Sequence, residues 1–225
     1  TNDGTDNPYF TNSEVNAFIN DFEVNNDSID LGLQNLNQIT FGVQNDNKFT
    51  SNINLIDGDV SFKTGEGTNQ LATANGILNI STQGTVSLGT NIGGDSIRLE
   101  EINIAAQDIE LNGNIETTKT ITLDAGNTGD ITNMTSNGIT LFAGEDVNLG
   151  GQFTAFELTG LYLTNDVNAV SDLDLSNVNV FEVTQEQVNN KTGLNFESSS
   201  NTIMFGNVNA DYLTLVGEYE LNSHK

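Results

Sequence analysis

The stretch Asp108-Ile109-Glu110-Leu111 shows the pattern that decides the fold: an acidic or polar residue, then two apolar residues separated by one position. Closely similar stretches recur between Asp59 and Asp174, where the six copies are Asp59-Val60-Ser61-Phe62, Thr85-Val86-Ser87-Leu88, Asp108-Ile109-Glu110-Leu111, Asp130-Ile131-Thr132-Asn133, Asp146-Val147-Asn148-Leu149 and Asp166-Val167-Asn168-Ala169. Their first residues are 26, 23, 22, 16 and 20 positions apart. An irregular repeat of this length is typical of a solenoid.

Further apolar pairs with the same spacing lie between these copies: Ile97/Leu99, Ile102/Ile104, Ile121/Leu123, Ile139/Leu141, Leu161/Leu163, Leu173/Leu175 and Val178/Val180. Successive side chains of a strand point to opposite faces, so both members of a pair lie on one side of a strand. Strands with so few inward residues need support from equivalent strands in neighbouring coils. We also expect asparagines at the bends to form amide ladders along the stack, at Asn112, Asn114, Asn127, Asn148 and Asn165.

The composition of the 225-residue chain favours an all-β fold. It contains 22 glycines and one proline, and its hydrophobic and charged fractions are 36% and 16%. Gly, Asn and Asp tolerate the backbone conformations that tight bends require. Antiparallel hairpins stay open as an alternative, because four Asn-Gly or Asp-Gly pairs occur, at Asp57-Gly58, Asn75-Gly76, Asn112-Gly113 and Asn137-Gly138. Recurrence of one pattern at about one coil length favours parallel coils.

The ends of the chain differ from its repetitive body. Residues 1–27 are expected to form an N-terminal arm with a capping helix over 9–24, because Val15, Phe18, Ile19 and Phe22 form one apolar stripe. Such a cap would cover the open end of the stack; a helix packed on a lateral face is the alternative. The parallel β-helix is expected over 28–183. Residues 184–225 are expected to form an irregular final coil or a C-terminal edge strand, with a strand donated to a neighbouring molecule as the alternative.

The charge and the cysteine content restrict the classes of partner and of chemistry that we expect for the chain. The net charge of −25 comes from 31 acidic and 6 basic residues, and it disfavours nucleic acid and anionic membranes. The chain has no cysteine, and it contains no apolar run long enough for membrane insertion. The opening Thr1-Asn2-Asp3-Gly4 is not a signal peptide, which we interpret as a processed or excised start.

Two segments carry a resemblance to a known family. Residues 9–20, Tyr-Phe-Thr-Asn-Ser-Glu-Val-Asn-Ala-Phe-Ile-Asn, begin with an aromatic residue and then Thr, followed by regularly spaced apolar positions. Residues 113–126 and 138–147 contain Gly-x-Ile-x-Leu-x-Ala-Gly-like repeats. With these segments the chain resembles secreted bacterial exoproteins of the filamentous-haemagglutinin type, and β-helical surface adhesins more broadly, over most of residues 9–180. The resemblance implies a right-handed parallel β-helix, export to the cell surface or medium, and a role in adhesion or scaffolding.

Several residues are candidates for chemistry or binding. Hard oxygen ligands suit calcium, and stacking brings acids of successive bends together, so a structural calcium site is predicted at Asp57, Asp59, Glu145, Asp146, Asp172 and Asp174. No other cofactor is expected. Exposed aromatic residues suit sugar binding, and the candidates are Tyr162, Tyr212 and Tyr219, whose simpler role is packing.

Enzymatic activity is not expected. Acids that could act near Arg98 are Asp95, Glu100, Glu101, Asp108 and Glu110, but a solvated acidic face with one ion pair explains them more simply. His224 is the one histidine and lies beside the C-terminus, so a serine triad has no base.

The sequence therefore predicts a secreted or surface-displayed, non-enzymatic β-solenoid that acts as an adhesin or display scaffold. Its expected partners are a receptor of the host or a neighbouring cell, a glycan, or like subunits. Two alternatives are a subunit of an extracellular filament, assembled end to end or by donated strands, and a polysaccharide lyase or hydrolase on the same scaffold.

Overall fold

The computed structural model describes residues 77–88, 91–93, 98–183 and 193–221, together with the backbone of eight short strands between residues 22 and 71. These eight are β1 (Phe22–Val24), β2 (Ile29–Leu33), β3 (Gln38–Ile39), β4 (Val43–Gln44), β5 (Asn47–Lys48), β6 (Thr50–Leu55), β7 (Val60–Thr64) and β8 (Gln70–Leu71). The others are β9 (Ile77–Ser81), β10 (Thr85–Leu88), β11 (Leu99–Ala105), β12 (Asp108–Leu111), β13 (Ile115–Asp124), β14 (Asp130–Asn133), β15 (Ile139–Phe142), β16 (Val147–Thr154), β17 (Phe156–Leu163), β18 (Val167–Glu182), β19 (Leu194–Asn209) and β20 (Leu213–Leu221).

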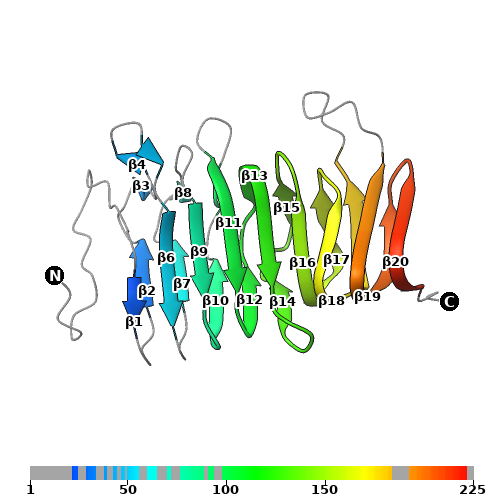
Figure 1. Ribbon diagram of the computed structural model, residues 1–225, viewed down its shortest axis with the longest axis horizontal. Helices are drawn as coiled ribbons and strands as arrows, with labels where there is room; N and C mark the ends of the chain where they lie inside the picture. Colours follow the sequence, from blue (N-terminus) through cyan, green and yellow to red (C-terminus); the bar gives the residue numbers. More distant parts are fainter. Residues whose placement is uncertain are drawn as a thin grey trace.

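Parallel pairing dominates the fold and confirms the all-β solenoid. Sixteen of the described strands form one continuous sheet, and every described strand pair in it is parallel. Among the described residues, β4 and β5 form the one antiparallel pair. Figure 1 shows the strands stacked side by side from β1 at one end to β20 at the other. The hairpin alternative is therefore wrong for the body of the chain.

The sheet wraps around the core as three faces, because its longest strands continue around the bends. The first face contains β1, β6, β9, β11, the end of β13, the start of β16 and residues 167–169, 194–197 and 213–216. The second contains β2, β7, β10, β12, β14, the end of β16 and residues 173–175, 203–205 and 219–221. The third contains Ile92, the start of β13, β15 and residues 161–163, 180–182 and 207–209.

The six copies of the repeated pattern do not all lie on the same face. The first four copies lie on the second face, where Val60, Val86, Ile109 and Ile131 are successive partners. The copies that begin at Asp146 and Asp166 lie on the first face instead, where Val147 pairs with Val167. Ile131 is followed on its own face by Phe153, which is 22 residues later. The interval of 16 residues is therefore a change of face and not a short coil.

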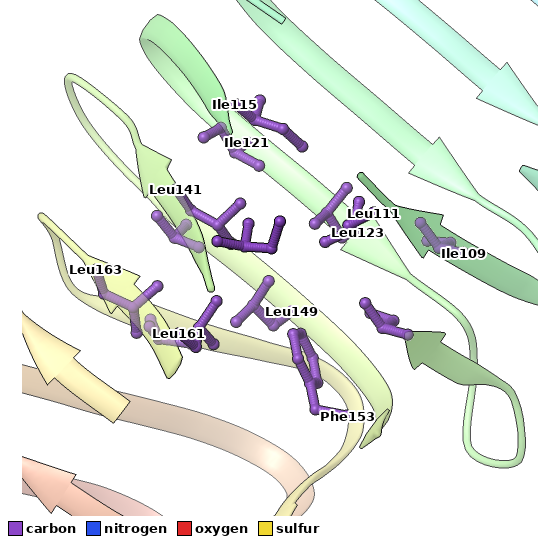
Figure 2. Packing of buried hydrophobic residues seen from close by; sticks show 14 of the residues in the cluster. Ile109, Leu111, Ile115, Ile121, Leu123, Leu141, Leu149, Phe153, Leu161 and Leu163 are labelled. Atoms are coloured by element: carbon purple, nitrogen blue, oxygen red, sulfur yellow. The ribbon is translucent and has the colours of Figure 1, made fainter. Parts of the chain in front are cut away.

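Columns of apolar side chains fill the interior, as Figure 2 shows for the middle of the stack. On the first face, Ile102, Ile121, Val147, Val167 and Phe196 are successive partners, and each is fully buried. Complete burial of each such side chain contributes about 1.5–3 kcal/mol. Phenylalanines enter the core in the later coils, where the paired rings are Phe153 with Phe156 at 5.5 Å and Phe196 with Phe205 at 4.9 Å between centroids.

The structure tests the predictions for the two ends of the chain to different extents. The predicted capping helix over 9–24 lies outside the described residues, except that Phe22–Val24 form strand β1 and pair with β6. In the tail, β19 and β20 continue the parallel stack, and Leu194, Phe196 and Ile203 pair with Leu213, Leu215 and Tyr219. Among the described strands β20 pairs with β19 alone, so it forms an edge of the sheet.

Candidate functional site

Side-chain oxygens at the bends join successive coils. Carboxylates accept backbone N–H groups of a later coil: Asp108 from Asp130 (3.0 Å), Asp166 from Asn195 (3.2 Å), Asp172 from Thr202 (2.9 Å) and Glu182 from Gly193 (2.5 Å) and Asp211 (2.9 Å). Amide ladders are also present, with side-chain bonds between Asn79 and Asn103, Asn148 and Asn168, and Asn179 and Asn207. Many acids and amides of this acidic chain thus hold the stack together.

The four predicted calcium ligands that the structure describes do not form one site. Asp57 and Asp59 lie outside the described residues, and Glu145 and Asp146 are exposed at one bend. Asp172 and Asp174 accept the backbone N–H groups of Thr202 and Ser176. Within the described part of the chain, no three His, Cys, Asp or Glu residues form a group that could hold a metal ion. Structural calcium stays a prediction, which excess chelator tests by its effect on the melting temperature.

Of the acids predicted to act near Arg98, Glu100, Asp108 and Glu110 each bond to other groups, and Asp95 lies outside the described residues. Arg98 forms an ion pair with Glu116 at 3.0 Å, and its guanidinium lies 4.2 Å above the ring centroid of Phe142. The Glu110 carboxylate accepts a hydrogen bond from the Ser87 hydroxyl at 2.5 Å.

Lys119 forms an ion pair with the nearly buried carboxylate of Glu100. The hydrogen bond and the electrostatic attraction of Glu100 raise the pKa of the Lys119 ammonium above its ordinary value of 10.5. A group whose pKa is raised on folding stabilises the folded state fully below the unfolded-state pKa, and this stabilisation disappears as pH rises through the folded-state pKa.

We therefore expect Lys119→Met to lower the melting temperature at neutral pH, and the difference from the wild type to shrink above about pH 10.5. Thermal melts of both proteins between pH 7 and 11.5 measure this difference in melting temperature. Lys119→Arg is the control, because arginine keeps its charge over this range. A Lys119→Met difference that does not depend on pH would contradict the ion pair.

The predicted tyrosines lie at two places. Tyr162 is half-buried on the third face and stacks on Phe181, with ring centroids 5.0 Å apart and 16° between the ring planes. Both rings lie against Gly160, where a Cβ atom would come within 3.1 Å of them, so they cover bare backbone. Tyr212 and Tyr219 are 69% and 48% exposed in the last coil. The structure therefore does not bring the three tyrosines into one site.

Two grooves lie at the edge where the second face turns into the third. Both occur in the links that follow second-face strands, and asparagine is the most frequent lining residue in each. We call this region the amide edge, and its residues are Asn91, Asn112, Asn114, Asn137, Asn177, Asn179 and Asn207.

The larger groove, which we call the asparagine groove, has a volume of about 530 Å³. It is lined by Asn91, Asn112, Gly113, Asn114, Met134, Thr135, Ser136, Asn137 and Gly138. The Oδ1 atom of Asn91 accepts the backbone N–H of Asn114 at 2.8 Å, and the Oδ1 atom of Asn114 accepts that of Thr140 at 2.9 Å. These bonds fix both amide groups to the coils that they connect. Met134, at 55% exposure, supplies an apolar contact beside them.

The smaller groove has a volume of about 260 Å³ and is lined by Glu157, Ser176, Asn177, Val178, Asn179 and Asn207. The amide of Asn179 donates to the carbonyl of Glu157 at 2.7 Å and accepts from the amide of Asn207 at 2.9 Å. The bend between β16 and β17 contains Ala155, whose φ of 61° is rare for a residue with a side chain. Leu158, on β17, is 98% exposed.

Comparisons with known proteins add no identification. No protein-family model matches the chain, and neither a curated protein nor a solved structure matches it. The geometry alone therefore supports the functional argument. Within the described residues, no helix has both the length and the apolar character needed to span a bilayer.

Sequence reasoning predicted amide ladders but missed the asparagine groove. Asn91 and Asn114 each lie three residues after the end of a second-face strand, at Leu88 and Leu111. Alignment of the coils on these strand ends would have placed both asparagines at the same edge. Met134 and Asn137 carry no comparable signal.

Proposed function

We propose that the protein is a non-enzymatic, extracellular β-solenoid that acts as an adhesin or surface-display scaffold through its amide edge. The observation that carries the proposal is the pair of open, polar grooves on one edge of a rigid stack. Grooves of a few hundred Å³ with a few fixed polar groups are typical ligand sites.

The stack supports binding because it holds the edge in one geometry. Apolar columns pack beneath the edge, and side-chain oxygens of one coil bind the backbone of the next. Groups fixed before a ligand arrives lose little conformational entropy on binding. Repetition along the axis also suits a long ligand or a surface that makes several contacts.

A binding experiment with matched lysine variants tests the proposal. The wild type is applied to a glycan array and to cultured cells, beside an edge variant with Asn112→Lys and Asn137→Lys, both at exposed positions. The control carries Gln107→Lys and Thr128→Lys, which are exposed at bends between the first and second faces and change the charge equally. We expect the edge variant to lose binding and the control to keep it. Wild-type protein that binds neither glycans nor cells would contradict the proposal.

A second candidate function, filament assembly, is favoured by the last coil. Strand β20 has one described partner, and it exposes Leu213, Val216 and Tyr219 at 41%, 50% and 48%. Exposed apolar edge strands are templates for pairing with another chain. Sedimentation over a wide concentration range tests this. For a filament subunit the mean mass of the assemblies rises with protein concentration, and this rise disappears when residues 211–225 are deleted. A constant monomer mass would contradict it.

A further inference from the structure

We infer that the asparagine groove binds one unit of an uncharged oligosaccharide; this inference rests on the proposed function and names its ligand class. Among the described residues, none that lines the groove is ionisable, although the chain as a whole has a net charge of −25. Its lining offers amide groups, hydroxyl groups, backbone and one exposed thioether side chain. An uncharged ligand with many hydroxyl groups matches this lining.

Charged ligands fit the groove poorly. An anionic ligand would have to approach a strongly acidic protein without any cation in the lining to receive it. A cation would lose hydration without gaining a carboxylate partner in the groove, although carboxylates are abundant elsewhere on the surface. A neutral ligand meets neither penalty.

The hydrogen bonds that Asn91 and Asn114 already form determine which of their side-chain atoms can bond to a ligand. The Oδ1 atom of each already accepts a backbone N–H of the next coil. The Nδ2 group of each carries two hydrogens that can be donated to hydroxyl oxygens. These donors are held by the coil structure, and Met134 beside them can contact the C–H surface of a sugar ring. Donors and an apolar surface side by side are the combination that a sugar unit requires.

The smaller groove offers further contacts to a ligand that lies along the amide edge. It lies on the same edge, and the third-face partners Thr140, Tyr162 and Phe181 connect the two grooves through successive coils. Each coil advances about 4.8 Å, so Asn114 and Asn179 lie three coils and about 14 Å apart along the axis. An oligosaccharide that runs parallel to the axis can therefore contact both grooves, and Leu158, which follows Glu157 of the smaller groove, is 98% exposed.

Aspartate substitutions separate the ligand role of these amides from their structural role. Asn91→Asp and Asn114→Asp keep the oxygen that accepts the backbone N–H and remove the two amide hydrogens. Asn127→Asp is the matched control, because the Oδ1 atom of Asn127 also accepts a backbone N–H, that of Asp172 at 3.1 Å, on a bend away from the groove. All three variants add one negative charge.

The experiment measures binding of the full chain to a panel of neutral, sialylated and uronate-containing oligosaccharides, with melting temperatures recorded for every variant. We expect wild type and Asn127→Asp to bind neutral members equally. Asn91→Asp and Asn114→Asp should each bind on the order of tenfold more weakly at an unchanged melting temperature, as expected from lost hydrogen-bond donors. Met134→Ala should also weaken binding.

This inference would be overturned, and the adhesin proposal left intact, by preferential binding of charged oligosaccharides or by neutral binding that Asn91→Asp, Asn114→Asp and Met134→Ala do not change. Adherence to cells without binding to any oligosaccharide would also overturn it. Absence of both glycan binding and cell adherence would instead contradict the proposed function.

Discussion

Gly129→Ala is expected to destabilise the protein by more than about 2 kcal/mol, because the coils approach too closely at Gly129 for any side chain. An added Cβ atom would lie 1.9 Å from the carbonyl oxygen of Gln107 and 2.2 Å from that of Ala125. Both atoms belong to the backbone, so neither can rotate away. Urea denaturation followed by circular dichroism measures the loss.

Gly126→Ala, in the same bend, is the matched control. Gly126 has a φ of +67°, but an added Cβ atom there would meet no atom within 4 Å. The substitution therefore costs only the strain of a left-handed backbone, about 1–2 kcal/mol. Equal effects of the two substitutions would show that the coils are not packed as closely as described.

Phe153→Ala is expected to cost about 3–5 kcal/mol, the largest effect of any single side-chain truncation that we propose. Phe153 is 1% exposed, continues the second-face column after Ile131, and packs its ring against Phe156. Each coil is supported by its neighbours alone, so a cavity here weakens the contact between the two halves of the stack.

Leu158→Ala is the control for Phe153→Ala, since Leu158 is 98% exposed and its truncation should change stability by less than about 0.5 kcal/mol. Denaturation curves of both variants give the comparison. A small loss for Phe153→Ala would mean that the column of inward residues does not form the core.

The sequence predicts that strands of successive coils stack on one another, but it does not predict which face of the solenoid each strand occupies. Alternation at Ile109 and Leu111, and at Ile121 and Leu123, correctly places these side chains in the core. The same apolar spacing serves all three faces, however, so the pattern does not reveal which face a copy occupies. The copy at Asp146 follows the copy at Asp130 by only 16 residues because its strand lies on another face.

The candidate site was less predictable for a related reason. Acids and amides occur at every bend, and the sequence does not show which of them bind the next coil. Asp172 is a predicted calcium ligand, and the structure shows that its carboxylate also accepts the backbone N–H of Thr202. Asn114 was expected in an amide ladder, but its Oδ1 atom accepts the backbone N–H of Thr140, and it lines a groove whose other wall comes from the following coil. That groove depends on register, which alternation does not determine.

Cysteine cross-linking tests the central claim, parallel stacking in this register, most directly. The chain has no cysteine of its own, so introduced pairs are the only thiols. Thr132 on β14 aligns with Thr154 on β16, and their hydroxyl oxygens are 3.0 Å apart. Thr122 aligns with Asn148 on the first face, so Thr122 and Thr154 are not partners. We predict that Thr132→Cys with Thr154→Cys forms an intramolecular disulfide on mild oxidation, whereas Thr122→Cys with Thr154→Cys does not. Equal cross-linking of the two pairs, or none in the first, would contradict the stacked solenoid.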